Sequence, residues 1–116
     1  MEIIKLLEAQ IENTNPDRFR YFKSIKAGKY TLSIQGSTGH YCTPRESLKA
    51  SKYSSMEIAI MNKNSMVSIN LSSVFRKFSR YSELLECADS LGSKAAVYGY
   101  VPVDLINDLY LFLTND

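Results

Sequence analysis

The chain has 116 residues, of which 45% are hydrophobic and 22% charged, and its formal net charge at pH 7 is +2. These values are typical of one globular domain, so we expect residues 1–116 to form a single domain around one core. Because no apolar run approaches the ~20 residues of a membrane helix, we expect no membrane partner, no signal peptide and a cytoplasmic location. Cys42 and Cys87 are then expected to be reduced thiols instead of a disulfide.

The charges are distributed unevenly along the chain. Residues 13–80 hold 12 Lys or Arg and three acidic residues, whereas residues 81–116 hold six acidic residues and one Lys. A basic middle followed by an acidic end can mark an interaction surface.

The first predicted elements are a helix and a strand. Apolar residues at helical spacing predict a helix over residues 2–12, which ends before Pro16. Basic and aromatic side chains alternate over residues 18–23, and the stretch that holds them, residues 17–30, fits either a short strand or an irregular turn at its start. Alternating apolar residues then predict a half-buried strand over residues 30–35.

The next segment is expected to extend this strand as far as Cys42 and then to turn. Thr43 is a good helix N-cap, Pro44 suits the first helical position, and Glu46 completes a capping box. This pattern predicts one or two helical turns over residues 44–50.

A hairpin and a helical region follow. Apolar residues alternate over residues 56–61 and again from Val67, with turn-forming residues between, which predicts a β-hairpin. Helical spacing then runs from Val74 to Gly92, with a break near residues 79–82 that divides it into two shorter helices.

The last predicted elements are a strand and a helix. Residues 94–102 predict a short strand, and Pro102 begins a helix with a broad apolar face and with Asp104 and Asp108 on its exposed side. The resulting order, α-β-β-β-α-β-α, predicts a small α+β fold. We expect an antiparallel or mixed sheet of roughly three to five strands with helices packed on one face.

His40 and Cys42 come nearest to a catalytic pattern. A thiolate beside an imidazole is the arrangement that activates cysteine nucleophiles, so an enzyme that uses Cys42 is one hypothesis. On a straight strand, however, the two side chains lie about 7 Å apart, too far for a direct hydrogen bond. We therefore prefer a structural role and assign no catalytic residue.

The residue types present give little support to a metal or cofactor site. The nitrogen and sulfur ligands besides Met are His40, Cys42 and Cys87, fewer than the four ligands of a structural zinc site. No glycine-rich phosphate motif precedes a predicted helix. We therefore expect neither a metal nor a cofactor.

Basic and aromatic residues between positions 18 and 80 are the strongest electrostatic signal. If they converge, they offer a partner a positive surface with tyrosine rings as stacking platforms. The alternative is that the charges are solvated around the rim of the sheet and the aromatic residues lie in the core. The residues that we expect at a contact surface are Arg18, Arg20, Tyr21, Lys23, Lys26, His40, Tyr41, Arg45, Arg76, Lys77 and Arg80.

Three segments, HYCTPRESL, SSMEIAIMN and VYGYVPVDLINDL, resemble a group of small phage and prophage proteins over residues 30–113. In that group a His-Tyr-Cys-Ser/Thr-Pro-Arg motif comes early, here at residues 40–45. A Tyr-Val-Pro-Val-acidic-Leu segment closes the domain, here at residues 100–105. The resemblance implies a protein that acts in the bacterial host cytoplasm by binding a host protein. Inhibitors of bacterial defence, anti-CRISPR proteins among them, are a prominent class of such proteins.

The first function hypothesis is therefore a non-enzymatic phage or mobile-element protein that binds and inhibits a host protein or ribonucleoprotein complex, such as a CRISPR effector. The alternative is a small nucleic-acid-binding or regulatory protein that uses the basic residues of segment 18–80. Its affinity for nucleic acid is expected to fall steeply as the salt concentration rises. The sequence leaves the oligomeric state open.

Overall fold

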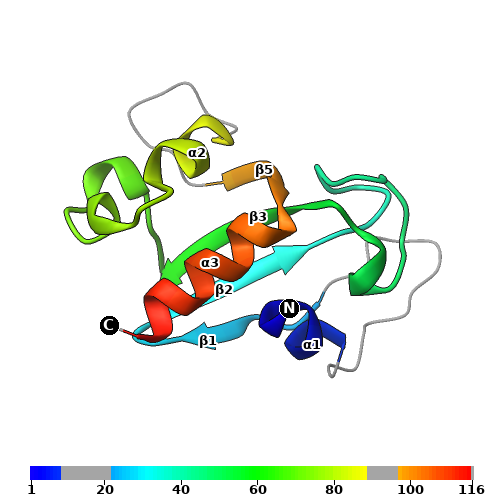
Figure 1. The fold of residues 1–116 in the computed structure, drawn as a ribbon, viewed down its shortest axis with the longest axis horizontal. Coiled ribbons are helices and arrows are strands. Elements are labelled where there is room, and N and C mark those ends of the chain that lie inside the picture. Colours follow the sequence, from blue (N-terminus) through cyan, green and yellow to red (C-terminus); the bar gives the residue numbers. More distant parts are fainter. Residues whose placement is uncertain (9–21, 89–96, 116) are drawn as a thin grey trace.

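The computed structural model describes residues 1–8, 22–88 and 97–115, and Figure 1 shows the fold. Its helices and strands are α1 (Glu2–Glu8), β1 (Ile25–Ala27), β2 (Tyr30–Gln35), β3 (Ser55–Asn62), β4 (Ser65–Met66), α2 (Tyr81–Glu86), β5 (Val97–Pro102) and α3 (Val103–Thr114). The described ranges also contain the short 3₁₀ helices η1 (Ala50–Lys52), η2 (Ile69–Leu71) and η3 (Phe75–Lys77).

Within these ranges, five strands form one open antiparallel sheet. β2 lies between β1 and β3, while the other edge of β3 pairs with β5 at one end and with β4 at the other. The predicted α+β class and antiparallel sheet are confirmed. The order of elements differs from the predicted one by one additional strand, β1, which falls in the segment that the sequence left open between strand and turn.

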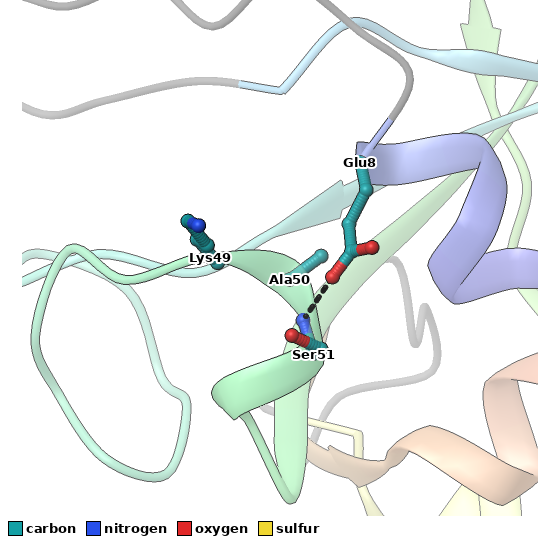
Figure 2. A pocket seen from close by; sticks show the side chains of 4 residues that line it. All are labelled: Glu8, Lys49, Ala50 and Ser51. Carbon is teal, nitrogen blue, oxygen red and sulfur yellow. Dashed lines mark hydrogen bonds between the residues drawn. The ribbon is translucent and has the colours of Figure 1, made fainter.

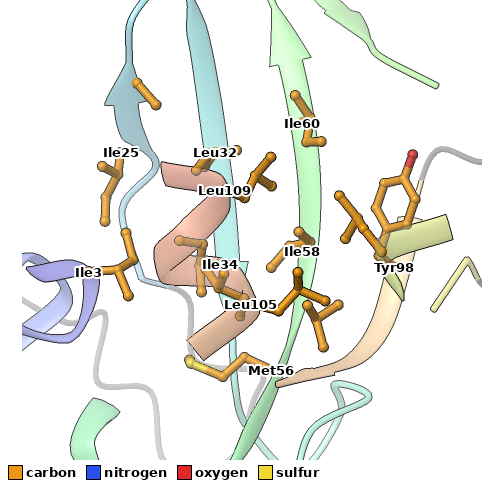
Figure 3. Close-up of a cluster of buried hydrophobic side chains, with 14 of the residues drawn as sticks. Ile3, Ile25, Leu32, Ile34, Met56, Ile58, Ile60, Tyr98, Leu105 and Leu109 are labelled. Carbon is orange, nitrogen blue, oxygen red and sulfur yellow. The ribbon is translucent and has the colours of Figure 1, made fainter. Parts of the chain in front are cut away.

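The core lies between the sheet and α3, which crosses one face of the sheet (Figures 1 and 3). Residues two apart on a strand point to the same face, so alternating apolar residues gather on the side that α3 covers. The buried side chains there include Leu32, Ile34, Ile58, Ile60, Leu105 and Leu109. Each contributes about 1.5–3 kcal/mol to folding by leaving water. Ile3 of α1 joins the same cluster and ties the N-terminal helix to the core.

The turn between β1 and β2 depends on Gly28. Its φ of +62° lies in the left-handed region that favours glycine. A Cβ atom at this position would lie 2.4 Å from the backbone oxygen of Leu113 in α3. The turn therefore packs directly on the end of α3, and glycine is the residue that fits.

The prediction of helical turns over residues 44–50 is wrong. The chain there is irregular, and a side chain just beyond the segment bonds two of its backbone groups in place of helical hydrogen bonds. The Tyr53 hydroxyl accepts a hydrogen bond from the Leu48 N–H at 2.8 Å and donates one to the Glu46 carbonyl at 2.6 Å. Tyr53 is buried. The burial of Tyr53 and these two bonds override the helix signal of residues 44–50.

The other helices agree with the sequence more closely. α1 matches the start of the helix predicted over residues 2–12, and the rest of that prediction lies outside the described residues. The helical region from residue 74 is broken close to the expected place, but its first part is only the single turn η3, and α2 follows from Tyr81. α3 begins after Pro102, as predicted. No helix in the described part of the chain has the length and apolar character needed to cross a membrane.

Candidate functional site

The segment around His40 is a compact turn, not the predicted extension of β2, which ends at Gln35. Neighbouring groups bond to Ser37, a residue with no exposed surface. Its hydroxyl shares a 2.6 Å hydrogen bond with Nδ1 of His40 and accepts one from the Gly39 N–H at 3.1 Å. Its carbonyl accepts one from the His40 N–H at 3.3 Å and one from the Cys42 thiol at 3.4 Å. The turn is therefore built around Ser37.

This turn buries the two residues that looked catalytic. His40 is 6% exposed and Cys42 1% exposed, so the expectation that His40 lies on the surface is wrong. The imidazole and the thiol bond to different atoms of Ser37. The hydrogen bonds fold the chain back on itself, and the strand geometry assumed for the pair does not apply.

The same turn exposes Tyr41 and fixes its backbone on two strands. The Tyr41 N–H donates to Oε2 of Glu57 in β3 at 2.9 Å. The Tyr41 carbonyl accepts a hydrogen bond from the Tyr100 N–H in β5, also at 2.9 Å. A further bridge joins Thr43 to Ser55 at the start of β3. Tyr41 is thus held in a defined place although its ring faces solvent.

Tyr41, Arg45 and Tyr100 together form what we call the aromatic surface. The Tyr41 and Tyr100 rings stack with centroids 5.7 Å apart and planes 24° apart. The two residues are 39% and 48% exposed, so both rings are accessible to a partner. The guanidinium carbon of Arg45 lies 5.5 Å from the Tyr41 ring centroid, in a cation–π contact.

A β-bulge explains why Tyr100 is exposed. Along β5, Tyr98 pairs with Ile58 and Val101 pairs with Met56, so three steps on β5 match two on β3. Strict alternation would have placed the Tyr98 and Tyr100 side chains on the same face of the sheet. With the bulge, Tyr98 is buried, while Tyr100, whose φ is +52°, points outward. Sequence reasoning missed Tyr100, although a glycine inside a strand, here Gly99, is a known signal for a bulge.

Gly99 also brings β5 close to Tyr41. A Cβ atom at Gly99 would lie 3.0 Å from the Cβ of Tyr41, closer than such atoms normally approach. The Gly99 N–H donates to the Cys87 carbonyl at 2.9 Å, which joins β5 to the end of α2. A side chain at position 99 would therefore push Tyr41 away from Tyr100.

A hollow of about 400 Å³ lies beside the two rings. Its lining residues are Tyr41, Glu86, Cys87, Ala88, Gly99 and Tyr100. Burial raises the pKa of the Cys87 thiol, and the charges of Glu86 and Glu83 raise it further. Cys87 therefore stays a neutral thiol at pH 7, which makes it a poor nucleophile.

The structure separates most of the expected basic residues. Residues 36–52 (cyan to green) and residues 69–77 (light green to yellow-green) lie at opposite ends of the longest axis in Figure 1. Arg45 belongs to the first segment, and the exposed Arg76 and Lys77 belong to the second. Salt at physiological concentration screens charges beyond about 8 Å, so these groups act independently.

The remaining expected contact residues have other surroundings. Lys23 and Lys26 are exposed at β1. Arg18, Arg20 and Tyr21 lie outside the described residues. Of the expected set, the structure brings together Tyr41 and Arg45.

Arg80 makes contacts within the molecule. Its guanidinium bonds to Glu83 at 2.7 Å and to Asp104 and Asp108 of α3 at 2.9 Å each. The hydrogen bond from Arg80 lowers the pKa of Glu83, and the carboxylates raise the pKa of Arg80 above its ordinary value. Arg80 thus clamps the start of α2 to α3.

A second hollow, of about 490 Å³, lies where α1 meets η1 (Figure 2). Glu8 accepts a hydrogen bond from the Ser51 N–H at 3.2 Å, and Lys49 and Ala50 complete the lining. The bond fastens the end of α1 to η1. This hydrogen bond gives the described lining of the hollow a structural role.

Comparisons with known proteins give no family for this chain. A scan against protein-family models, a search of curated proteins and a search of solved structures each found no match. The resemblance to small phage proteins therefore stays a prediction. Among the residues that the structure describes, no three His, Cys, Asp or Glu side chains are grouped to hold a metal ion.

Proposed function

We propose that this chain is a non-enzymatic binding protein that contacts a host protein complex through the aromatic surface. The observation that carries the proposal is the exposed Tyr41–Tyr100 stack with Arg45 beside it. Tyr and Arg are the side chains that most often dominate the energy of protein interfaces. The residues come from two separate segments, and hydrogen bonds hold the Tyr41 and Tyr100 backbones in place, which reduces the entropy lost by ordering these two segments on association.

The strain at Tyr100 supports the same proposal. A non-glycine residue with positive φ costs about 1–2 kcal/mol, and such strain tends to persist where it serves a function. A more relaxed strand would bury Tyr100 or turn it away from Tyr41. The bulge instead keeps two rings together on the surface.

We propose further that the partner is a bacterial defence complex, such as a CRISPR effector, and that the chain is a phage or mobile-element inhibitor acting in the host cytoplasm. The support for this part is the sequence resemblance over residues 30–113. A small, rigid contact surface is consistent with a protein that acts by occlusion.

Nucleic-acid binding is the second candidate function. The observation that favours it is the Tyr41–Arg45 pair, because a ring beside a guanidinium is also a platform for stacking bases. The separation of the basic residues weakens this candidate. A continuous phosphate path needs positive charges that follow one another along a groove.

The test is an affinity capture from bacterial lysate, done with and without nuclease treatment, with three versions of the chain. The wild type and Leu71→Ala, which changes an exposed side chain in η2, are expected to retain one stoichiometric protein complex. Tyr100→Gly is expected to lose it, because the stack is removed while glycine accepts the positive φ. Equal recovery with all three versions would contradict the proposal. Recovery of nucleic acid alone, lost after nuclease, would favour the second candidate.

A further inference from the structure

We propose that the hollow beside the aromatic surface binds the guanidinium group of an arginine side chain on the partner protein. This inference rests on the proposed function, because it names the chemistry that the aromatic surface recognises. It is carried by the walls of the hollow and by the charges around it.

The walls of the hollow suit a planar cation. Tyr41 and Tyr100 supply aromatic surface, and Gly99 and Ala88 add small residues to the lining. Aromatic faces attract cations, arginine more often than lysine, because a guanidinium both stacks and donates hydrogen bonds. The chain shows this preference at Tyr41 itself, where Arg45 lies over the ring.

The charges around the hollow also favour a cation. Glu86 lines it, and Glu57 contacts the Tyr41 backbone. Glu83 lies one turn before Glu86 on α2, and although Arg80 pairs with it, its charge still acts at Cys87. Besides burial, the charges of Glu86 and Glu83 raise the pKa of the Cys87 thiol, so these two carboxylates make the potential at that sulfur more negative, and Arg45 on the Tyr41 ring is the nearby opposing charge. A negative potential attracts a guanidinium and repels a phosphate.

The carboxylate that we expect to meet the guanidinium is Glu86. It is exposed at the C-terminal end of α2. A negative charge is unfavourable at that end of a helix, so α2 gains no stability from it. Glu86→Gln is therefore expected to fold normally and to change the charge of the hollow alone.

The test is a titration of the isotope-labelled full chain, followed by the amide resonances of Ala88, Gly99 and Tyr100. The probe is the peptide acetyl-Gly-Ser-Arg-Ser-Gly-amide, and its control carries citrulline, a neutral isostere, in place of arginine. We expect saturable shifts with the arginine peptide and at least about fivefold weaker binding of the citrulline peptide. Glu86→Gln is expected to weaken arginine binding about three- to fivefold, and Glu2→Gln, an exposed glutamate of α1, not at all.

Three results would overturn the inference: equally tight binding of the citrulline and arginine peptides, shifts that occur only with an oligothymidylate, or no saturable shift with any probe. These outcomes are separable from a failure of the proposed function. If Tyr100→Gly abolishes capture of the complex while the arginine peptide does not bind, the aromatic surface is the contact site but its ligand is not arginine. If Tyr100→Gly leaves capture unchanged, the proposed function itself fails.

Discussion

At the scale of single residues, Tyr100 and Gly28 both adopt the left-handed backbone conformation, but with side chains of very different size. Both have a positive φ, of +52° and +62°. At Gly28 the chain uses the residue that adopts this conformation without strain. At Tyr100 it keeps a large aromatic side chain, and the strain is retained where the ring stacks on Tyr41.

The strain at Tyr100 can be measured by comparing two substitutions. Tyr100→Gly and Tyr100→Ala both remove the ring, but only glycine removes the strain. We expect the glycine variant to have a free energy of unfolding about 1 kcal/mol higher than the alanine variant in urea denaturation. Equal stabilities would show that the backbone at this position relaxes in the alanine variant.

Gly28→Ala is expected to destabilise the protein by at least about 2 kcal/mol. The left-handed conformation costs about 1–2 kcal/mol for alanine, and the new Cβ meets the Leu113 carbonyl at 2.4 Å. Lys29→Ala in the same turn is the control, expected to lower stability by no more than about 1 kcal/mol, through the cation–π contact of Lys29 with Tyr30. A loss in the glycine variant as small as in the control would contradict the tight packing of this turn on α3.

At the scale of elements, β2 and β3 could be predicted from the sequence and the segment between them could not. The return strand of the hairpin, predicted from Val67, is instead Ser65–Met66. Alternation of apolar residues is a local signal, and it placed β2 and β3 correctly. Residues 36–50 follow instead the Ser37 hydrogen bonds and the Tyr53 hydroxyl, which depend on side chains that the folded chain buries and not on alternation or helical spacing. Thr43 and Glu46 match the capping-box pattern, but the helix that they would cap does not form, because these hydrogen bonds are made instead.

Tyr53→Phe tests this competition. The substitution leaves the Leu48 N–H and the Glu46 carbonyl without their hydroxyl partner, so we expect a loss of about 1–2 kcal/mol in the free energy of unfolding. Hydrogen exchange is expected to speed up at Leu48. Tyr100→Phe, which removes a solvent-exposed hydroxyl, is the matched control and should change neither quantity. Unchanged exchange at Leu48 in Tyr53→Phe would refute this explanation of the segment.

The Arg80 clamp between α2 and α3 predicts a dependence of stability on pH. Because the folded-state pKa of Glu83 is lowered, its contribution is present above its ordinary value of 4.5 and is lost as the pH falls through the folded-state value. The raised pKa of Arg80 keeps the guanidinium charged throughout this range. Arg80→Met is therefore expected to be less stable than the wild type at pH 7, with a difference that shrinks below about pH 4.5 and in 1 M salt. If thermal denaturation shows the same stability difference between the two proteins at every pH and salt concentration, the effect of the substitution is due to packing alone.

At the scale of the whole molecule, the sequence predicted the fold class but not the surface. Tyr41 and Arg45 were expected as contact residues, whereas their neighbour Tyr100 was missed because the β5 bulge breaks the alternation. Arg80 was expected at a surface and is engaged by carboxylates from α2 and α3. The fold decides whether charges that are separated in sequence come together. In this fold, residues 36–52 and residues 69–77 lie far apart (Figure 1).

The proposed role of the aromatic surface is tested most directly by the dissociation constant of the complex captured from the lysate, measured for a small set of variants. We predict that Tyr41→Ala combined with Tyr100→Gly weakens binding at least about tenfold, as expected when two anchor residues are lost. Reversing charges away from the aromatic surface, with Lys26→Glu and Arg76→Glu, should change binding by less than about twofold at physiological salt. The opposite pattern, with the aromatic double variant binding normally and the charge reversals abolishing binding, would contradict the central claim and favour nucleic-acid or phosphate recognition.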